Sequence, residues 1–185
     1  MTTRHITRAA LITVASAALV ATASAPALAV PDASDTTALT ATIGSGSLSI
    51  SSQASVAFAA FTPSVYNGDG YENESFATLV TDNRAGTSGY TVSWSVTDFT
   101  TSPSNGKPIP ANRLTVTPMP ANDTSGTVTW TAGSASSSGS GVLGTASNVS
   151  GVNAVELITD LELRMPESAL AGEYGAVLTV SVTGG

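Results

Sequence analysis

The stretch Leu79–Phe99 constrains the fold of this chain more than any other. Over its second half, from Tyr90 to Thr97, large apolar residues alternate with hydroxyl residues. Successive side chains of a strand point to opposite faces, so this pattern predicts a strand with one face in a core and the other in water. The residues before it, Asp82–Gly89, favour a turn. We therefore predict a β-hairpin around this turn, with Tyr90 and Trp94 in the core.

The rest of the chain repeats the alternation in short segments. It occurs in Thr37–Ile43, Ser47–Ser51, Val155–Met165 and Tyr174–Val182. Gly44–Gly46 predicts a hairpin between the first two of these. Leu114–Val116 and Val128–Trp130 predict two further strands, the first ended by Pro118 and Pro120, whereas Val142–Asn153 is ambiguous.

About eight to ten short strands, with no helix pattern longer than a turn, predict an all-β fold. We expect an antiparallel, Greek-key-type β-sandwich, with a barrel as the alternative. In the last strand Tyr174, Leu178 and Val180 share the core face. Tyr174 is expected to bond backbone through its hydroxyl, as in a tyrosine corner.

The N-terminus predicts export. Basic residues and the one histidine, His5, precede an apolar run from Ala9 to Ala23, and Ala27–Ala29 gives the small-residue pattern that a signal peptidase requires. The run is shorter than the roughly 20 residues of a membrane-spanning helix. We predict a cleaved signal peptide (1–29), a flexible lead-in (30–36) and a single β-domain (37–185). The mature protein would then be secreted and associated with the cell surface, with no membrane segment left in it.

Charge and cysteine content exclude several classes of protein. Cleavage after Ala29 would leave four basic residues against 13 acidic ones, a net charge of about −9. So few cations argue against binding to nucleic acid or anionic lipid. The chain has no cysteine, which excludes disulfides and thiolate metal sites, so stability has to come from packing.

Parts of the sequence resemble the WxL cell-wall-binding domain. The resemblance rests on Leu79–Gly86, Gly89–Ser93, Thr97–Phe99 and Tyr174–Val182. The family has a D-x-R-G turn, a strand like G-W-T-L and a closing strand of the form Y-x-a-x-L-x-W-x-L. Tyr90 and Val180 stand where the family has tryptophans. The resemblance implies a divergent, β-rich surface protein of Gram-positive bacteria, held non-covalently at the peptidoglycan.

Catalysis is not expected. His5 lies in the predicted signal peptide and cysteine is absent, so the common nucleophile–base arrangements are missing. Asp160 and Glu162 share one strand face, but their alternation with Leu161 and Leu163 places both carboxylates in water. We predict a protein that is not an enzyme, with no catalytic residues and no cofactor.

A glycine-rich acidic loop is the best candidate for a metal site. Asn67, Asp69, Glu72 and Glu74 offer hard oxygen ligands of the kind that Ca²⁺ takes. Their spacing does not match an EF-hand, and a solvated acidic turn explains the same residues. We keep the four as weak candidates and predict that no metal is tightly bound.

Four residues are candidates for contact with a wall polymer or a surface partner. Tyr66 and Tyr71 fall in the acidic loop, where exposed rings could stack on sugars. Asp82 and Arg84 flank the central turn. Their structural interpretation, which we favour, is that Asp82 forms an Asx turn and Arg84 pairs with a nearby carboxylate.

Two functional hypotheses follow. The first is a non-enzymatic, exported surface protein that associates non-covalently with a cell-wall polymer or another surface protein. The alternative is a structural subunit of a surface fibre that assembles by strand addition, with the lead-in and Thr37–Ile43 as the donor. A small secreted hydrolase ranks below both.

Overall fold

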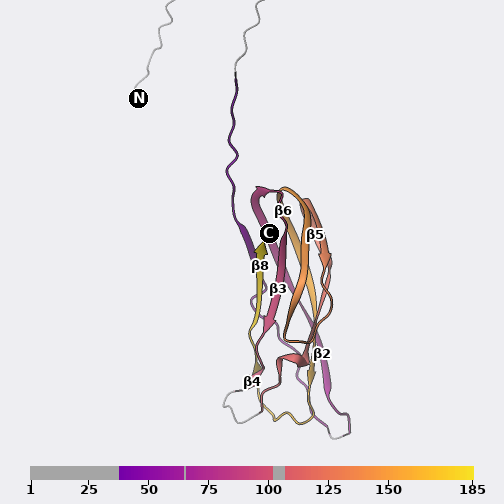
Figure 1. Ribbon diagram of the computed structural model, residues 1–185. Helices are drawn as coiled ribbons and strands as arrows, with labels where there is room; N and C mark the ends of the chain where they lie inside the picture. Colours follow the sequence, from indigo (N-terminus) through magenta and orange to yellow (C-terminus); the bar gives the residue numbers. More distant parts are fainter. Residues whose placement is uncertain (1–37, 65, 102–106) are drawn as a thin grey trace, which may run out of the picture. The chain divides into compact units, whose positions relative to one another are not determined.

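The computed structural model describes residues 38–64, 66–101 and 107–185. The predicted signal peptide, the lead-in and Thr37 lie outside the described residues. Within these, the regular structure is β apart from one 3-10 turn, Ala111–Arg113. The strands are β1 (Leu48–Ser52), β2 (Gly70–Gly86), β3 (Tyr90–Val96), β4 (Thr100–Thr101), β5 (Leu114–Ala132), β6 (Ser140–Met165), β7 (Tyr174–Gly175) and β8 (Leu178–Gly184) (Figure 1). The predicted all-β, antiparallel fold is confirmed.

The long strand β6 is the centre of the main sheet. β5 pairs with one of its edges along most of its length, while β2 and then β3 pair with the other. β1 adds to β2 and β8 adds to β3, which gives the order β1-β2-β6-β3-β8. Leu48 at the start of β1 lies beside Gly184 at the end of β8. The sheet is therefore nearly closed into a barrel.

The predicted hairpin over Leu79–Phe99 is wrong. Within the described residues, β2 and β3 each pair with β6 and not with each other. The pairing of β2 with β6 ends where Gly86 faces Gly151, and the pairing of β3 with β6 begins where Tyr90 faces Ala146. Both run antiparallel to β6, so they follow one another along the same edge. The polar stretch between them is a bend, where Ala85 adopts a φ of 54°. Turn-forming residues predict where a chain bends, but not which strand its arms will pair with.

The bend doubles the sheet over its own core. Phe76 of β2 and Val96 of β3 line one common cavity, although they lie far apart along the edge of β6. β6 bends at the matching place, where Asn148 and Gly151 have φ values of 50° and 74°. Long strands that cross such a bend replace several of the short strands that the sequence predicts.

Two other strand predictions are corrected. The described residues of the predicted first strand, Ala38–Ile43, carry no strand, so the hairpin at Gly44–Gly46 does not form and only β1 is present. Pro118 and Pro120 do not end a strand, because β5 continues through them as one edge strand with register shifts. Proline is tolerated at bulges on a sheet edge, where its missing N–H removes no ladder hydrogen bond. The ambiguous Val142–Asn153 belongs to β6.

The core residues predicted from alternation lie where expected. Tyr90 and Trp94 are 3% and 2% exposed. Trp94 faces Val180 across the β3–β8 pair, and its ring lies over Gly141 of β6. Val180 and Leu178 pack against the core, as does Tyr174, whose hydroxyl donates to the Leu170 carbonyl at 3.1 Å. The core side of β8 and the backbone hydrogen bond of Tyr174 are as predicted. The predicted single strand from Tyr174 to Val182 is interrupted, however, because Tyr174 lies in β7, which pairs with β4, and β8 begins at Leu178.

Candidate functional site

The buried Asp82 and the partly exposed Arg84 form an ion pair at the bend. Asp82 is 2% exposed, and its carboxylate accepts from the Arg84 Nε at 2.9 Å, the Arg84 Nη2 at 2.9 Å and the Arg84 backbone N–H at 3.0 Å. The Arg84 Nη2 also donates to the carbonyls of Ser88 and Gly89. This is the predicted Asx turn with a paired arginine. A burial this complete removes Asp82 from contact with a wall polymer.

The environment of this pair shifts two pKa values. The Arg84 guanidinium holds the pKa of the Asp82 carboxyl below its usual value, outweighing the opposite effect of burial. Tyr90 lies beside the pair and donates from its hydroxyl to the Asn153 Oδ1 at 3.0 Å. Burial raises the pKa of Tyr90 to about 12, and the nearby Asp82 carboxylate adds to that shift. The cluster ties the bend of β2 and β3 to β6.

The acidic loop does not bring its four oxygen ligands together. The Asp69 Oδ2 accepts from Arg113 at 2.8 Å and from Arg164 at 2.7 Å, and its Oδ1 accepts from the Glu167 N–H at 3.1 Å. These N–H donors, that of Glu167 first, lower the pKa of Asp69. Asp69 thus links the loop to the 3-10 turn and the end of β6.

The other three metal candidates lie apart from Asp69. Asn67 is exposed in a turn, whereas Glu72 and Glu74 are part of β2. Within the described residues, no group of three or more acidic or histidine side chains could hold a metal ion. That no metal ion is tightly bound at these four residues stays a prediction. The Asp69 carboxylate already forms ion pairs with Arg113 and Arg164.

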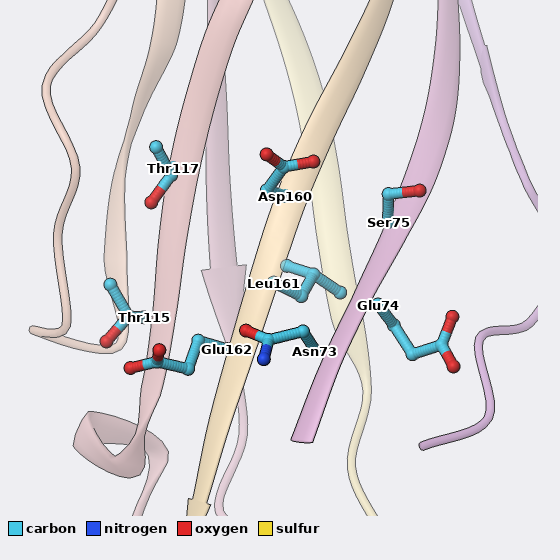
Figure 2. Close-up of a pocket in the computed structure, with 8 residues that line it drawn as sticks. All are labelled: Asn73, Glu74, Ser75, Thr115, Thr117, Asp160, Leu161 and Glu162. Atoms are coloured by element: carbon cyan, nitrogen blue, oxygen red, sulfur yellow. The ribbon is translucent and has the colours of Figure 1, made fainter. Parts of the chain in front are cut away.

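A polar hollow lies on the outer face of the sheet where β2, β6 and β5 run side by side (Figure 2). It has a volume of about 640 Å³. One row across it is Asn73–Glu162–Thr115 and the next is Ser75–Asp160–Thr117, each formed by register partners on the three strands. Figure 2 shows Asn73 between β2 and β6 and the Glu162 side chain on the β5 side of β6, near Thr115, while Glu74 points away to the other side of β2. We call these six side chains the polar rows.

The polar rows offer hydrogen-bonding groups of three kinds on a shallow surface. Asp160 and Glu162 are exposed, as the alternation predicted, and each has a hydroxyl-bearing threonine beside it on β5. Carboxylates accept, hydroxyls do both and the Asn73 amide donates and accepts. Such a surface can bind neutral, hydroxyl-rich ligands without a catalytic group.

An exposed aromatic ring extends this surface at one end. Tyr71 is the residue before the rows on the same face of β2; it is 54% exposed and pairs in register with Arg164. The Arg164 guanidinium carbon lies 5.9 Å from the centre of the Tyr71 ring, a cation–π distance. Tyr66 is 93% exposed in the preceding turn. Both tyrosines are accessible to a partner, in contrast to Asp82.

Sequence reasoning missed the polar rows as a unit. The alternation in Val155–Met165 and in Leu114–Thr117 marks which side chains face water, but three segments far apart in the chain have to become neighbours to form the rows. Asn153 was also missed, since an isolated asparagine in an ambiguous segment carries no signal of its own.

The comparisons with known proteins give no further assignment. No protein-family model matches the sequence, and the search of curated proteins finds no match to it. Among the described residues, no helix has the length and apolar character needed to cross a membrane.

Proposed function

We propose that this chain is an exported, non-enzymatic surface protein that binds a neutral cell-wall glycan through the polar rows and Tyr71. The observation that carries the proposal is the outer face of β2, β6 and β5, where two rows of hydrogen-bonding side chains lead to a half-exposed ring. Sugar hydroxyls hydrogen-bond to carboxylates and amides, and aromatic rings stack on sugar faces. The predicted signal peptide supports export, and the resemblance to wall-binding domains supports a place at the cell wall.

The negative net charge of the protein limits which wall polymers it could bind. The full chain has a net charge of −7, which the predicted cleavage after Ala29 would change to about −9; either charge repels anionic wall polymers at low salt, and the repulsion is screened over roughly 10 Å at 0.1 M. The proposed ligand is therefore the uncharged part of a glycan strand. Binding should strengthen as salt rises, whereas a protein with a basic patch would lose affinity.

A pull-down on purified peptidoglycan tests this proposal with matched variants. Asp160→Asn with Glu162→Gln removes two charges from the polar rows while keeping the side-chain shapes. Glu167→Gln with Glu173→Gln removes two charges from exposed positions outside the rows. If only net charge matters, both variants are retained at least as well as the unmodified protein.

The proposal expects the first variant to be retained less and the second to be unchanged or retained more. Tyr71→Ala should weaken retention as well, because it removes the stacking ring. Equal retention of all three variants, or elution of the unmodified protein at every salt concentration, would remove wall binding through this face.

A further inference from the structure

A large apolar cavity opens where the barrel fails to close. Its volume is about 850 Å³, and it lies between the segment Ser52–Pro63 on one side and the residues from Ala169 to the start of β8 on the other. Its lining includes Phe58, Phe76, Phe99, Leu161, Leu178 and Val180. Because this hollow is open to solvent and lined mainly by apolar side chains, it leaves apolar surface that a further segment could bury.

On both sides of the cavity, backbone N–H and C=O groups have no strand partner among the described residues. β8 is the last strand of the sheet and pairs with β3 alone in the described structure. On the opposite side, Gln53 donates to the Ala77 carbonyl, but no backbone hydrogen bond ties Ala54–Pro63 to another strand among the described residues. An open edge beside an apolar cavity is the arrangement to which an extended chain can add.

The same chain carries an extended segment that suits this gap. In Ala38–Ile43, Leu39 and Ile43 are 91% and 86% exposed, and Ala41 lies on the same side of an extended chain. The intervening residues are threonines, which favour strands. No charged residue lies between Asp35 and Asp69, so the segment escapes the repulsion expected between two acidic copies.

Connectivity favours a second copy as the source of this segment. It joins β1 at Leu48, which pairs with Asp82 at the bend, whereas the cavity begins at the other end of β1, at Ser52. Gly46 donates to the Asn83 carbonyl at 2.8 Å, and Asn83 donates to the Ser47 carbonyl at 2.9 Å. These hydrogen bonds continue the β1–β2 ladder away from the cavity, so the chain leaves β1 in the wrong direction to fill its own gap.

We propose that Ala38–Ile43 of one copy adds as a strand to the free edge of β8 in a second copy, with Leu39, Ala41 and Ile43 entering the cavity beside Leu178 and Val180. The donor then supplies the strand that the barrel lacks. Donor and acceptor are different surfaces, so the contact is heterologous and repeats head to tail. Assembly of this kind gives linear chains of subunits and is independent of glycan binding by the polar rows.

Disulfide trapping tests the contact, because the chain contains no cysteine of its own. One full chain carries Ala41→Cys and a second carries Ala176→Cys, which lines the cavity on the core side just before β8. Mixing the two under mild oxidation should give a dimer whose disulfide joins positions 41 and 176, identified by peptide mass. Ala135→Cys is the matched control, since it is exposed and lies outside the cavity lining.

Three outcomes decide the proposal. Formation of the 41–176 disulfide, with its loss when the donor also carries Leu39→Asp and Ile43→Asp, supports it. Trapping at position 135 as efficient as at 176, or trapping that survives the two aspartates, overturns it. A dilute chain that carries both Ala41→Cys and Ala176→Cys should remain largely uncrosslinked; an efficient disulfide within one chain would show that the segment fills its own cavity instead.

Discussion

Removal of the Arg84 side chain should invert the pH dependence of stability that Asp82 contributes. Asp82 is 2% exposed and receives two of its three N–H donors from the Arg84 guanidinium. In Arg84→Ala the backbone N–H of residue 84 remains, but the buried carboxylate loses its counter-charge. A buried charge without a partner is expensive, so the folded state has to carry it or protonate it.

The expected destabilisation at pH 7 is about 2–4 kcal/mol. Breaking a fully buried ion pair by removing one partner costs about 3–5 kcal/mol. The Arg84 side chain is 25% exposed, and water can enter the space it vacates, which lowers the figure from that range. The arginine also donates to the carbonyls of Ser88 and Gly89, so the bend loses those hydrogen bonds too.

The sign of the pH effect distinguishes this explanation from simple loss of packing. In the unmodified protein the pKa of Asp82 is lowered, so its contribution is present above the unfolded pKa of about 3.9 and is lost as pH falls through the folded pKa. In Arg84→Ala, burial without a counter-charge raises the pKa of Asp82. The folded state then binds the proton more readily than the unfolded state, and the variant gains stability as pH falls from 7 toward 4.

Urea unfolding followed by tryptophan fluorescence at pH 7 and at pH 4 measures both effects. The double variant Asp82→Asn/Arg84→Ala is the reference, because it lacks the titrating group but shares the missing arginine. Subtracting the reference removes the contributions of all other carboxylates. A loss below about 1 kcal/mol at pH 7, or an Arg84→Ala variant that does not gain stability relative to the reference as pH falls, would refute the reasoning.

Three further outcomes are expected. Trp94→Ala should lower the free energy of unfolding by about 3–5 kcal/mol, the range for emptying a buried aromatic site, and a loss under about 1 kcal/mol in denaturant titration would contradict its burial. Gly144→Ala should cost about 1–3 kcal/mol, because its new Cβ would meet the ring of Trp130, whereas Gly175→Ala, with open space around it, should be nearly neutral in the same assay. In an ultraviolet titration, one of the four tyrosines should ionise near pH 12, and Tyr90→Phe should remove that step. Because the pKa of Tyr90 is raised in the folded state, the stability that it contributes is present below pH 10 and declines between about pH 10 and pH 12.

The two-residue period of the sequence determined which side chains face the core. Tyr90 and Trp94 point inward and Asp160 and Glu162 point outward, because successive residues of a strand alternate whatever its neighbours are. The Asx turn at Asp82 was equally predictable, since a side chain that bonds the backbone two residues on acts within a few residues. Features that depend only on residues close together in the chain can therefore be predicted from the sequence.

Only the tertiary structure decided which strands became neighbours. Backbone hydrogen bonds in a ladder carry no residue identity, so the same alternation that predicts a hairpin at Asp82–Gly89 also fits two strands that follow one another along β6. The polar rows exist because β2, β6 and β5 align in one register, and Asp69 meets Arg113 and Arg164 rather than its neighbours in the loop for the same reason. These contacts depend on how the whole sheet doubles over its core to bury apolar surface, which no short segment specifies.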